Sequence, residues 1–111
     1  MASTHEDIPA HPIIDKPWQF EIVRFDFHRD PGDRRSSYLD LWLRRGEELR
    51  KLRFLQPRSI QIEEGFPSRT NGMAILDVSS LGWEDVAVQV TDFEASNGAV
   101  TFYAKDVVEV T

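Results

Sequence analysis

Apolar and polar residues alternate along several short stretches of the chain, and Trp18 is expected to open the first of these strands after Pro17. The pattern is clearest in the ranges 20–27, 60–63, 73–78, 86–90, 100–104 and 107–110. Alternation with a period of two is typical of strands that bury one face, and turn signals such as Asn71-Gly72 and Asn97-Gly98 separate the stretches. The chain is therefore predicted to be mainly β, with seven or eight short strands in an antiparallel β-sandwich; a small closed β-barrel is the alternative.

The first strand carries an irregularity in this pattern. Phe20 and Ile22 follow one phase of the alternation, whereas Val23, Phe25 and Phe27 follow the other. A slip of one residue turns all later side chains to the opposite face, unless an extra residue is inserted into the strand. We therefore predict a β-bulge at Ile22 and Val23.

Residues 38–56 admit two interpretations. This stretch is rich in Leu, Arg, Glu and Lys, which are strong helix formers, and a helix here would make the fold α+β. The alternation of Leu39, Leu41 and Leu43 favours a strand instead, and Gly46 suits a turn better than a helix interior. We predict a hairpin with a four-residue turn at Arg45–Glu48.

This hairpin has a definite register. It pairs Leu39 with Phe54, Leu41 with Leu52, Asp40 with Arg53 and Trp42 with Lys51. The first two pairs place apolar side chains on one face, and the last two are an ion pair and a cation–π pair on the other. Cross-strand complementarity on both faces supports the hairpin.

Cationic and aromatic side chains gather on the outer side of the predicted hairpin. Protein interfaces are enriched in Trp, Tyr and Arg, and basic residues interleaved with aromatics also suit single-stranded nucleic acid. The plainest alternative is an outer sheet surface neutralised locally by Asp40, Glu47 and Glu48. The candidate binding residues are Tyr38, Trp42, Arg44, Lys51 and Arg53.

Charge is distributed unevenly along the chain. Residues 16–69 hold twelve of the thirteen Lys and Arg residues, whereas residues 70–111 hold one basic and seven acidic residues. Clustered charge of this kind steers charged partners or a second copy of the chain. The net charge of −6 argues against nucleic acid, because phosphate binding needs a contiguous basic surface.

Asp26, His28, Asp30 and Asp33 are weak candidates for a metal site. Oxygen ligands with a histidine suit several cations, but this spacing matches no specific metal loop and neighbouring arginines oppose a cation. His28 is also the histidine expected in the folded body, so a small ligand-binding or enzymatic barrel would have to centre on it. No nucleophile elbow, dinucleotide fingerprint or phosphate loop accompanies it, and neither a metal nor a cofactor is expected.

The chain is predicted to form a flexible N-terminal arm, residues 1–17, and a single β domain, residues 18–111. Ile8, Ile13 and Ile14 could hold the arm against the domain. The absence of cysteine and of an apolar leader or span predicts a cytoplasmic protein without membrane contact.

Taken together, these patterns predict a non-enzymatic protein-binding or self-assembly module, whose partner is another protein or a second copy of the chain.

Overall fold

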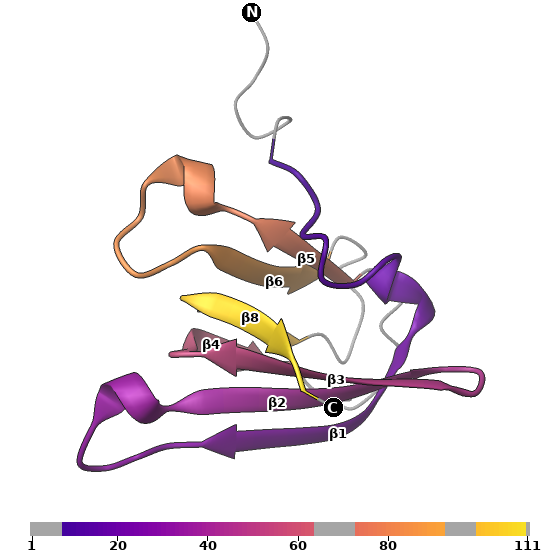
Figure 1. The fold of residues 1–111 in the computed structure, drawn as a ribbon, viewed down its shortest axis with the longest axis horizontal. Helices are drawn as coiled ribbons and strands as arrows, with labels where there is room; N and C mark the ends of the chain where they lie inside the picture. The colour runs from indigo at the N-terminus through magenta and orange to yellow at the C-terminus, as the bar shows by residue number, and fades with distance from the viewer. Residues whose placement is uncertain (1–7, 64–72, 93–99, 111) are drawn as a thin grey trace, which may run out of the picture.

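The computed structural model describes residues 8–63, 73–92 and 100–110. Its strands are β1 (Glu21–His28), β2 (Tyr38–Arg45), β3 (Glu48–Leu55), β4 (Arg58–Ile62), β5 (Met73–Asp77), β6 (Val88–Asp92), β7 (Val100–Ala104) and β8 (Asp106–Glu109). They form two antiparallel four-stranded sheets, with the strand orders β1-β2-β3-β8 and β4-β7-β6-β5. The sheets pack as two layers (Figure 1), which confirms the β-sandwich; within the described residues they do not close into a barrel.

The hairpin β2–β3 is the longest feature of the first sheet. Its register matches the prediction in all four pairs, including Asp40 with Arg53 and Trp42 with Lys51. The helical alternative for residues 38–56 is therefore wrong. The turn is shorter than predicted, because Arg45 already pairs with Glu48 and only Gly46 and Glu47 remain unpaired. Gly46 has a φ of +61°, a conformation that two-residue hairpin turns place on glycine.

Strand β1 pairs with the edge of β2 that β3 does not occupy, and it contains the predicted β-bulge. The pairing shifts between Ile22 and Arg24, so that Val23 is the extra residue. Ile22 pairs with Leu43 before the bulge and Phe25 pairs with Leu41 after it. The bulge thus keeps Ile22, Phe25 and Phe27 on the inner side of the sheet, whereas Val23, the extra residue, is 44% exposed.

The core lies between the two sheets. The apolar inner residues of the hairpin are fully buried, and valines and a phenylalanine of the second sheet cover them. The hairpin residues are Leu39, Leu41, Leu43, Leu52 and Phe54, and those of the second sheet are Val88, Val90 and Phe102. The rings of Phe54 and Phe102 meet edge to face with their centroids 4.9 Å apart. This contact joins the two layers, because Phe54 belongs to β3 and Phe102 to β7.

The described part of the N-terminal arm lies against the second sheet. His11 N–H donates to the carbonyl of Ile75 at 2.8 Å, and Asp77 N–H donates to the carbonyl of Pro9 at 2.9 Å. Ile14 is buried in the core, and Ile13 packs against it. These contacts cover the outer edge of β5, which would otherwise present unpaired backbone groups.

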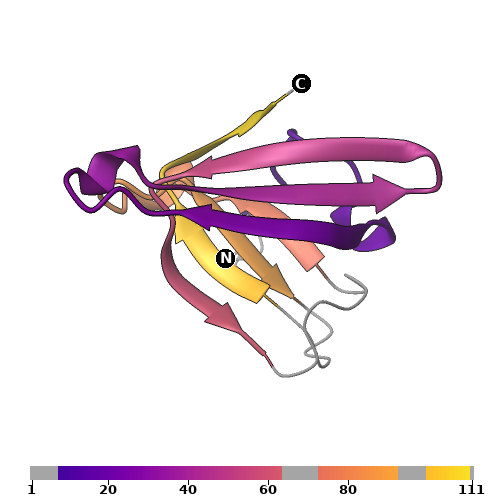
Figure 2. The ribbon, with the colours of Figure 1, turned by 90° about the horizontal axis from the view of Figure 1, so that it is seen from below.

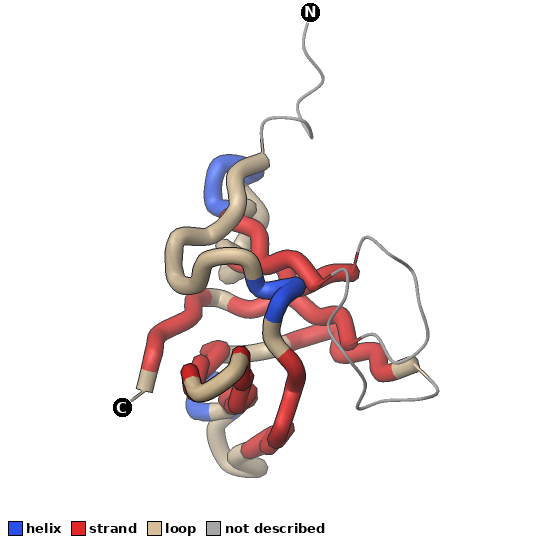
Figure 3. Tube along the Cα trace, turned by 90° about the vertical axis from the view of Figure 1, so that its right-hand side faces the viewer, coloured by secondary structure: helices blue, strands red, loops and turns tan. Residues whose placement is uncertain are grey.

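Helical structure in the described residues is confined to the 3₁₀ turns η2 (Pro17–Gln19), η3 (Arg34–Ser36) and η4 (Ser79–Leu81), shown in blue in Figure 3. Trp18 lies in η2 and does not open the first strand as predicted, because Lys16 adopts a left-handed conformation and the N–H groups of Gln19 and Phe20 close the turn. No helix in these ranges is long and apolar enough to cross a membrane.

Two details of the strand prediction differ or lie outside the described residues. Ile62 was expected on the buried side of its strand, but it is 49% exposed, since β4 is an edge strand with a register shift between Arg58 and Gln61. The predicted turns at Asn71-Gly72 and Asn97-Gly98 fall outside the described residues.

Candidate functional site

The solvent-facing side of β1, β2 and β3 carries all five predicted binding residues, and we call it the outer face. Figure 2 looks onto it, with the second sheet behind. Its members are Glu21, Arg24, Asp26, His28, Tyr38, Asp40, Trp42, Arg44, Leu49, Lys51, Arg53 and Leu55. They alternate with the buried inner residues of the same strands, so the pleat of the sheet positions all of them.

Trp42 lies at the centre of the outer face, between two cations. The guanidinium carbon of Arg24 is 4.7 Å from the centroid of the indole, and the ammonium nitrogen of Lys51 is 4.6 Å from it. Arg24 belongs to β1 and Lys51 to β3, the two neighbours of β2. Cation–π attraction from both flanking strands restricts the orientation of the indole.

Tyr38 is held in the same way, two pairs further along the hairpin. The imidazole of His28 stacks on it with the centroids 4.8 Å apart and 22° between the planes. The guanidinium carbon of Arg53 lies 4.0 Å from the centroid of the phenol ring. Both aromatic residues of the outer face are therefore ordered within the free protein.

Asp40 lies between these aromatic residues and is 3% exposed. The guanidinium of Arg53 donates two hydrogen bonds to its carboxylate, at 2.9 and 3.0 Å, and the ammonium of Lys51 is 3.6 Å away. The carboxylate raises the pKa of Arg53 above its ordinary value through this hydrogen bonding. Asp40 thus anchors the two cations that contact Tyr38 and Trp42.

Four of the five predicted binding residues, namely Tyr38, Trp42, Lys51 and Arg53, are brought together. Arg44 shares the face, but its guanidinium pairs with the carboxylate of Glu21 at 2.8 Å instead of contacting either aromatic ring.

The pairing of Asp40 with Arg53 was predicted from the sequence, but the place of Arg24 in the cluster was not. His28 was considered only as a metal or catalytic residue. The alternation in β1 places Arg24 and His28 on one face, but the pairing of β1 with β2 was not deduced. The connection between those strands is long, and a long connection does not fix a register as a two-residue turn does.

Two other arginines of the hairpin serve different contacts. Arg45 lies over the ring of Phe20 at 4.4 Å and bonds to Glu48 at 2.8 Å. Arg50 bonds to both Glu48 and Glu109. These bonds lower the pKa of each glutamate, that of Glu48 chiefly through Arg45 and that of Glu109 through Arg50. The basic residues of the hairpin therefore do not form one free cationic patch.

The four weak metal candidates make hydrogen bonds, an ion pair or a ring contact with neighbouring residues. Asp30 accepts a hydrogen bond from the N–H of Gly32, and Asp33 accepts bonds from the Arg35 N–H and the Ser36 hydroxyl. Asp26 lies 3.7 Å from Arg24, and His28 stacks on Tyr38. In the described part of the chain, no group of three or more His, Asp or Glu side chains is placed to hold a metal ion.

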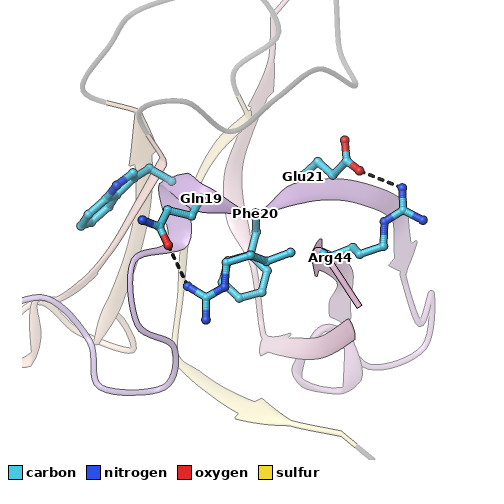
Figure 4. A pocket seen from close by; sticks show the side chains of 7 residues that line it. Gln19, Phe20, Glu21 and Arg44 are labelled. Carbon is cyan, nitrogen blue, oxygen red and sulfur yellow. Dashed lines mark hydrogen bonds and ion pairs between the residues drawn. The ribbon is translucent and has the colours of Figure 1, made fainter. Parts of the chain in front are cut away.

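A cleft of about 440 Å³ lies beside the tip of the hairpin. Figure 4 shows Phe20 in its wall, with Glu21 and Gln19 each bonded to an arginine. These bonds run from Arg44 to Glu21 at 2.8 Å and from Arg45 to Gln19 at 3.0 Å. Both guanidinium groups are engaged, so this cleft offers no free charge.

A second cavity, of about 740 Å³, lies at the other end of the hairpin. It is lined by Phe27, Arg29, Ser37, Gln56, Pro57 and Arg58. His28 is not among the residues that line either cavity, because its ring faces the outer side of the sheet.

Comparison with protein families, with curated proteins and with solved structures found no match for this chain. The arguments about function below therefore rest on the side chains themselves.

Proposed function

We propose that this protein is a non-enzymatic binding module whose outer face docks onto another protein surface, in the simplest case the same face of a second copy. The observation that carries the proposal is the arrangement of Trp42 and Tyr38 on the solvent side of the central strands, each held between side chains of β1 and β3. Aromatic residues ordered before binding lose little conformational entropy when a partner covers them.

The charges of the outer face support a protein partner over a polyanion. Each of its cations, Arg24, Arg44, Lys51 and Arg53, has a carboxylate of the same face within 4.0 Å. A nucleic acid phosphate would have to displace these carboxylates, and displacement forfeits the intramolecular ion pairs. A protein surface can instead cover the face while the pairs remain intact.

Exposed aliphatic side chains add to the contact area that such a partner would bury. Leu49 is 59% exposed next to Arg44, and Val108 of β8 is 40% exposed next to Arg53. Both side chains lie on the same face as Trp42 and add apolar area on either side of its charged residues. A two-fold contact would place this face against its own copy, in an isologous interface.

The test is the solution mass by light scattering of the wild type, Trp42→Arg and Trp83→Arg, with circular dichroism as a control for folding. Trp83 is a matched control, since it is 48% exposed and contacts Tyr103 of the second sheet. We expect a wild-type dimer that Trp42→Arg dissociates and Trp83→Arg preserves. A wild-type monomer at high concentration would exclude self-docking.

Salt distinguishes the geometry of self-association. An isologous dimer through Trp42 and Tyr38 should keep its mass between low and high salt, because the charges of the outer face are paired within each chain and not across the interface. A head-to-tail contact between the basic hairpin and the acidic residues 70–111 should dissociate as salt is added.

For a partner other than a second copy, the same three proteins serve as baits in affinity purification. A protein retained by the wild type and Trp83→Arg but lost with Trp42→Arg would support docking on the outer face.

A further inference from the structure

The second cavity differs from the cleft at the hairpin tip, because its arginines make no ion pair within the described chain. Arg29 and Arg58 line it, and neither makes an ion pair or a cation–π contact with another described residue. The neighbouring carboxylate of Asp30 accepts the N–H of Gly32 instead. Two exposed guanidinium groups at one cavity attract anions, and each presents a fork that matches a carboxylate or phosphate.

The cavity also offers neutral hydrogen-bonding groups. Ser37 precedes β2 and Gln56 follows β3 at the open end of the hairpin, where the N–H of Gln56 donates to the carbonyl of Ser37 at 2.9 Å. The hydroxyl of Ser37 and the side-chain amide of Gln56 make no hydrogen bond with any described residue. Both can donate to an oxygen atom placed between the arginines.

The backbone that presents Arg58 is strained. Gln56 has a φ of +50° and Ser59 a φ of +58°, and both are left-handed although neither is glycine. Gln56 also precedes Pro57, a position that favours extended backbone. Strain of this kind costs of order 1 kcal/mol or more per residue and tends to collect at sites where a side chain must point in a fixed direction.

One wall of the cavity is apolar. Phe27 lies on the inner side of β1, opposite the fully buried Leu39, yet it is 42% exposed. The inner face of the first sheet therefore continues past the core into the cavity, where Pro57 adds a second apolar surface. An inorganic ion alone would leave this wall in contact with water.

We propose that this cavity binds a small organic anion, a carboxylate or phosphate carried on an apolar or aromatic body. The anionic group lies between Arg29 and Arg58 and accepts hydrogen bonds from Ser37 and Gln56, and the apolar body covers Phe27. The volume of about 740 Å³ falls in the range of small-molecule sites. The site is independent of the outer face, because Phe27 points to the opposite side of β1 from Asp26 and His28.

The experiment is calorimetric titration of the full chain with phenyl phosphate and with benzoate. The proteins are the wild type, Arg29→Gln, Arg58→Gln and Arg35→Gln. Arg35 is the matched control, since it is exposed, makes no ion pair with a described residue and does not line the cavity. Melting curves of each variant verify folding, which removal of exposed guanidinium groups should leave intact.

We expect saturable binding of at least one of the two probes to the wild type and to Arg35→Gln. Arg29→Gln and Arg58→Gln should each weaken it about tenfold, the loss of one hydrogen bond to a charged group. Benzyl alcohol, which lacks the charge, and inorganic phosphate, which lacks the ring, should bind more weakly than phenyl phosphate.

Three results would overturn the proposal. The first is no saturable binding of either probe at about 10 mM, where even a site with a millimolar dissociation constant would be filled. The second is wild-type affinity in Arg29→Gln and Arg58→Gln, and the third is inorganic phosphate binding as tightly as phenyl phosphate. Trp42→Arg should bind the probe like the wild type. If no probe binds, the proposed docking on the outer face still stands, and if the protein does not dock through Trp42, the proposed anion site still stands.

Discussion

Replacing Asp40 by Asn should be among the most destabilising changes available on the outer face. The side chain of Asp40 is 4% exposed and pairs with Arg53 through two hydrogen bonds, with Lys51 a further 3.6 Å away. Asparagine fits the same space but has no charge, so two cations lose their counterion. Breaking a buried ion pair from one side costs about 3–5 kcal/mol.

The expected cost is lower than that range because Arg53 is not itself buried. Its side chain is 31% exposed and that of Lys51 is 27% exposed, so both can regain water when the carboxylate is lost. We therefore expect Asp40→Asn to reduce the free energy of unfolding by about 2–3 kcal/mol. A domain of this size should then melt roughly 10–15 °C lower.

The assay is a double-mutant cycle in urea with Asp40→Asn, Arg53→Met and the combined variant. The coupling between the two residues should be about 1.5–3 kcal/mol, within the range measured for residues that share a network. Glu21 and Arg44 provide the control cycle: their ion pair is 2.8 Å long, but the two side chains are 46% and 53% exposed. Exposed pairs contribute about 0.2–1 kcal/mol.

Equal coupling in the two cycles would refute the reasoning. It would mean that the burial of Asp40 does not strengthen its pairing and that the contacts around Tyr38 and Trp42 are no better ordered than an exposed surface. A large coupling for Asp40 together with a small one for Glu21 would show that the centre of the outer face is fixed before any partner arrives.

Three further predictions concern stability and are all measured by urea denaturation. The pKa values of Glu48 and Glu109 are lowered in the folded state, so their contribution is present above about pH 4.5 and is lost as the pH falls through the lowered values; Arg50→Gln should make this acid-side loss shallower. Gly46→Val should destabilise by about 1–2 kcal/mol and Gly46→Asn by less, because valine resists the φ of +61°; equal costs would contradict this. Phe54→Ala should cost about 3–5 kcal/mol through loss of its contact between the sheets, and a cost below 1 kcal/mol would be incompatible with a fully buried ring.

The sequence predicted the strands well where the alternation of apolar and polar residues alone determines which side of a strand is buried. The alternation of Leu39, Leu41 and Leu43 overrode the helix propensity of the same residues, because a strand buries all three on one side. The phase slip at Ile22 predicted a bulge that the pairing of β1 confirms. Trp18 was misplaced, since nothing in its own residue type announces that Lys16 turns the chain left-handed.

The cavity could not be predicted in the same way. Phe27, Ser37 and Arg58 belong to three different strands or connections, and their proximity depends on how β3 leads into β4. That path runs through the left-handed Gln56, and a glutamine before proline gives no local indication of such a conformation. Hairpin registers follow from short-range rules, whereas the ends of a sandwich depend on all the strands together.

The structure also changes what the charge asymmetry of the sequence means. The abundance of basic residues around the hairpin suggested one cationic surface, yet Arg44, Arg45, Arg50, Lys51 and Arg53 are all ion-paired within the chain. Anions should therefore not bind to the basic residues of the hairpin, although positive charge is most dense there.

The two free arginines at the cavity, Arg29 and Arg58, become the expected anion site instead. Backbone amide shifts recorded during a phenyl phosphate titration test this directly. The changes should concentrate near Ser37 and Gln56 and leave Lys51 unaffected. Changes centred on Trp42 and Lys51 would show that the intramolecular ion pairs open readily, and a surface that opens to anions would be a poor candidate for salt-independent docking.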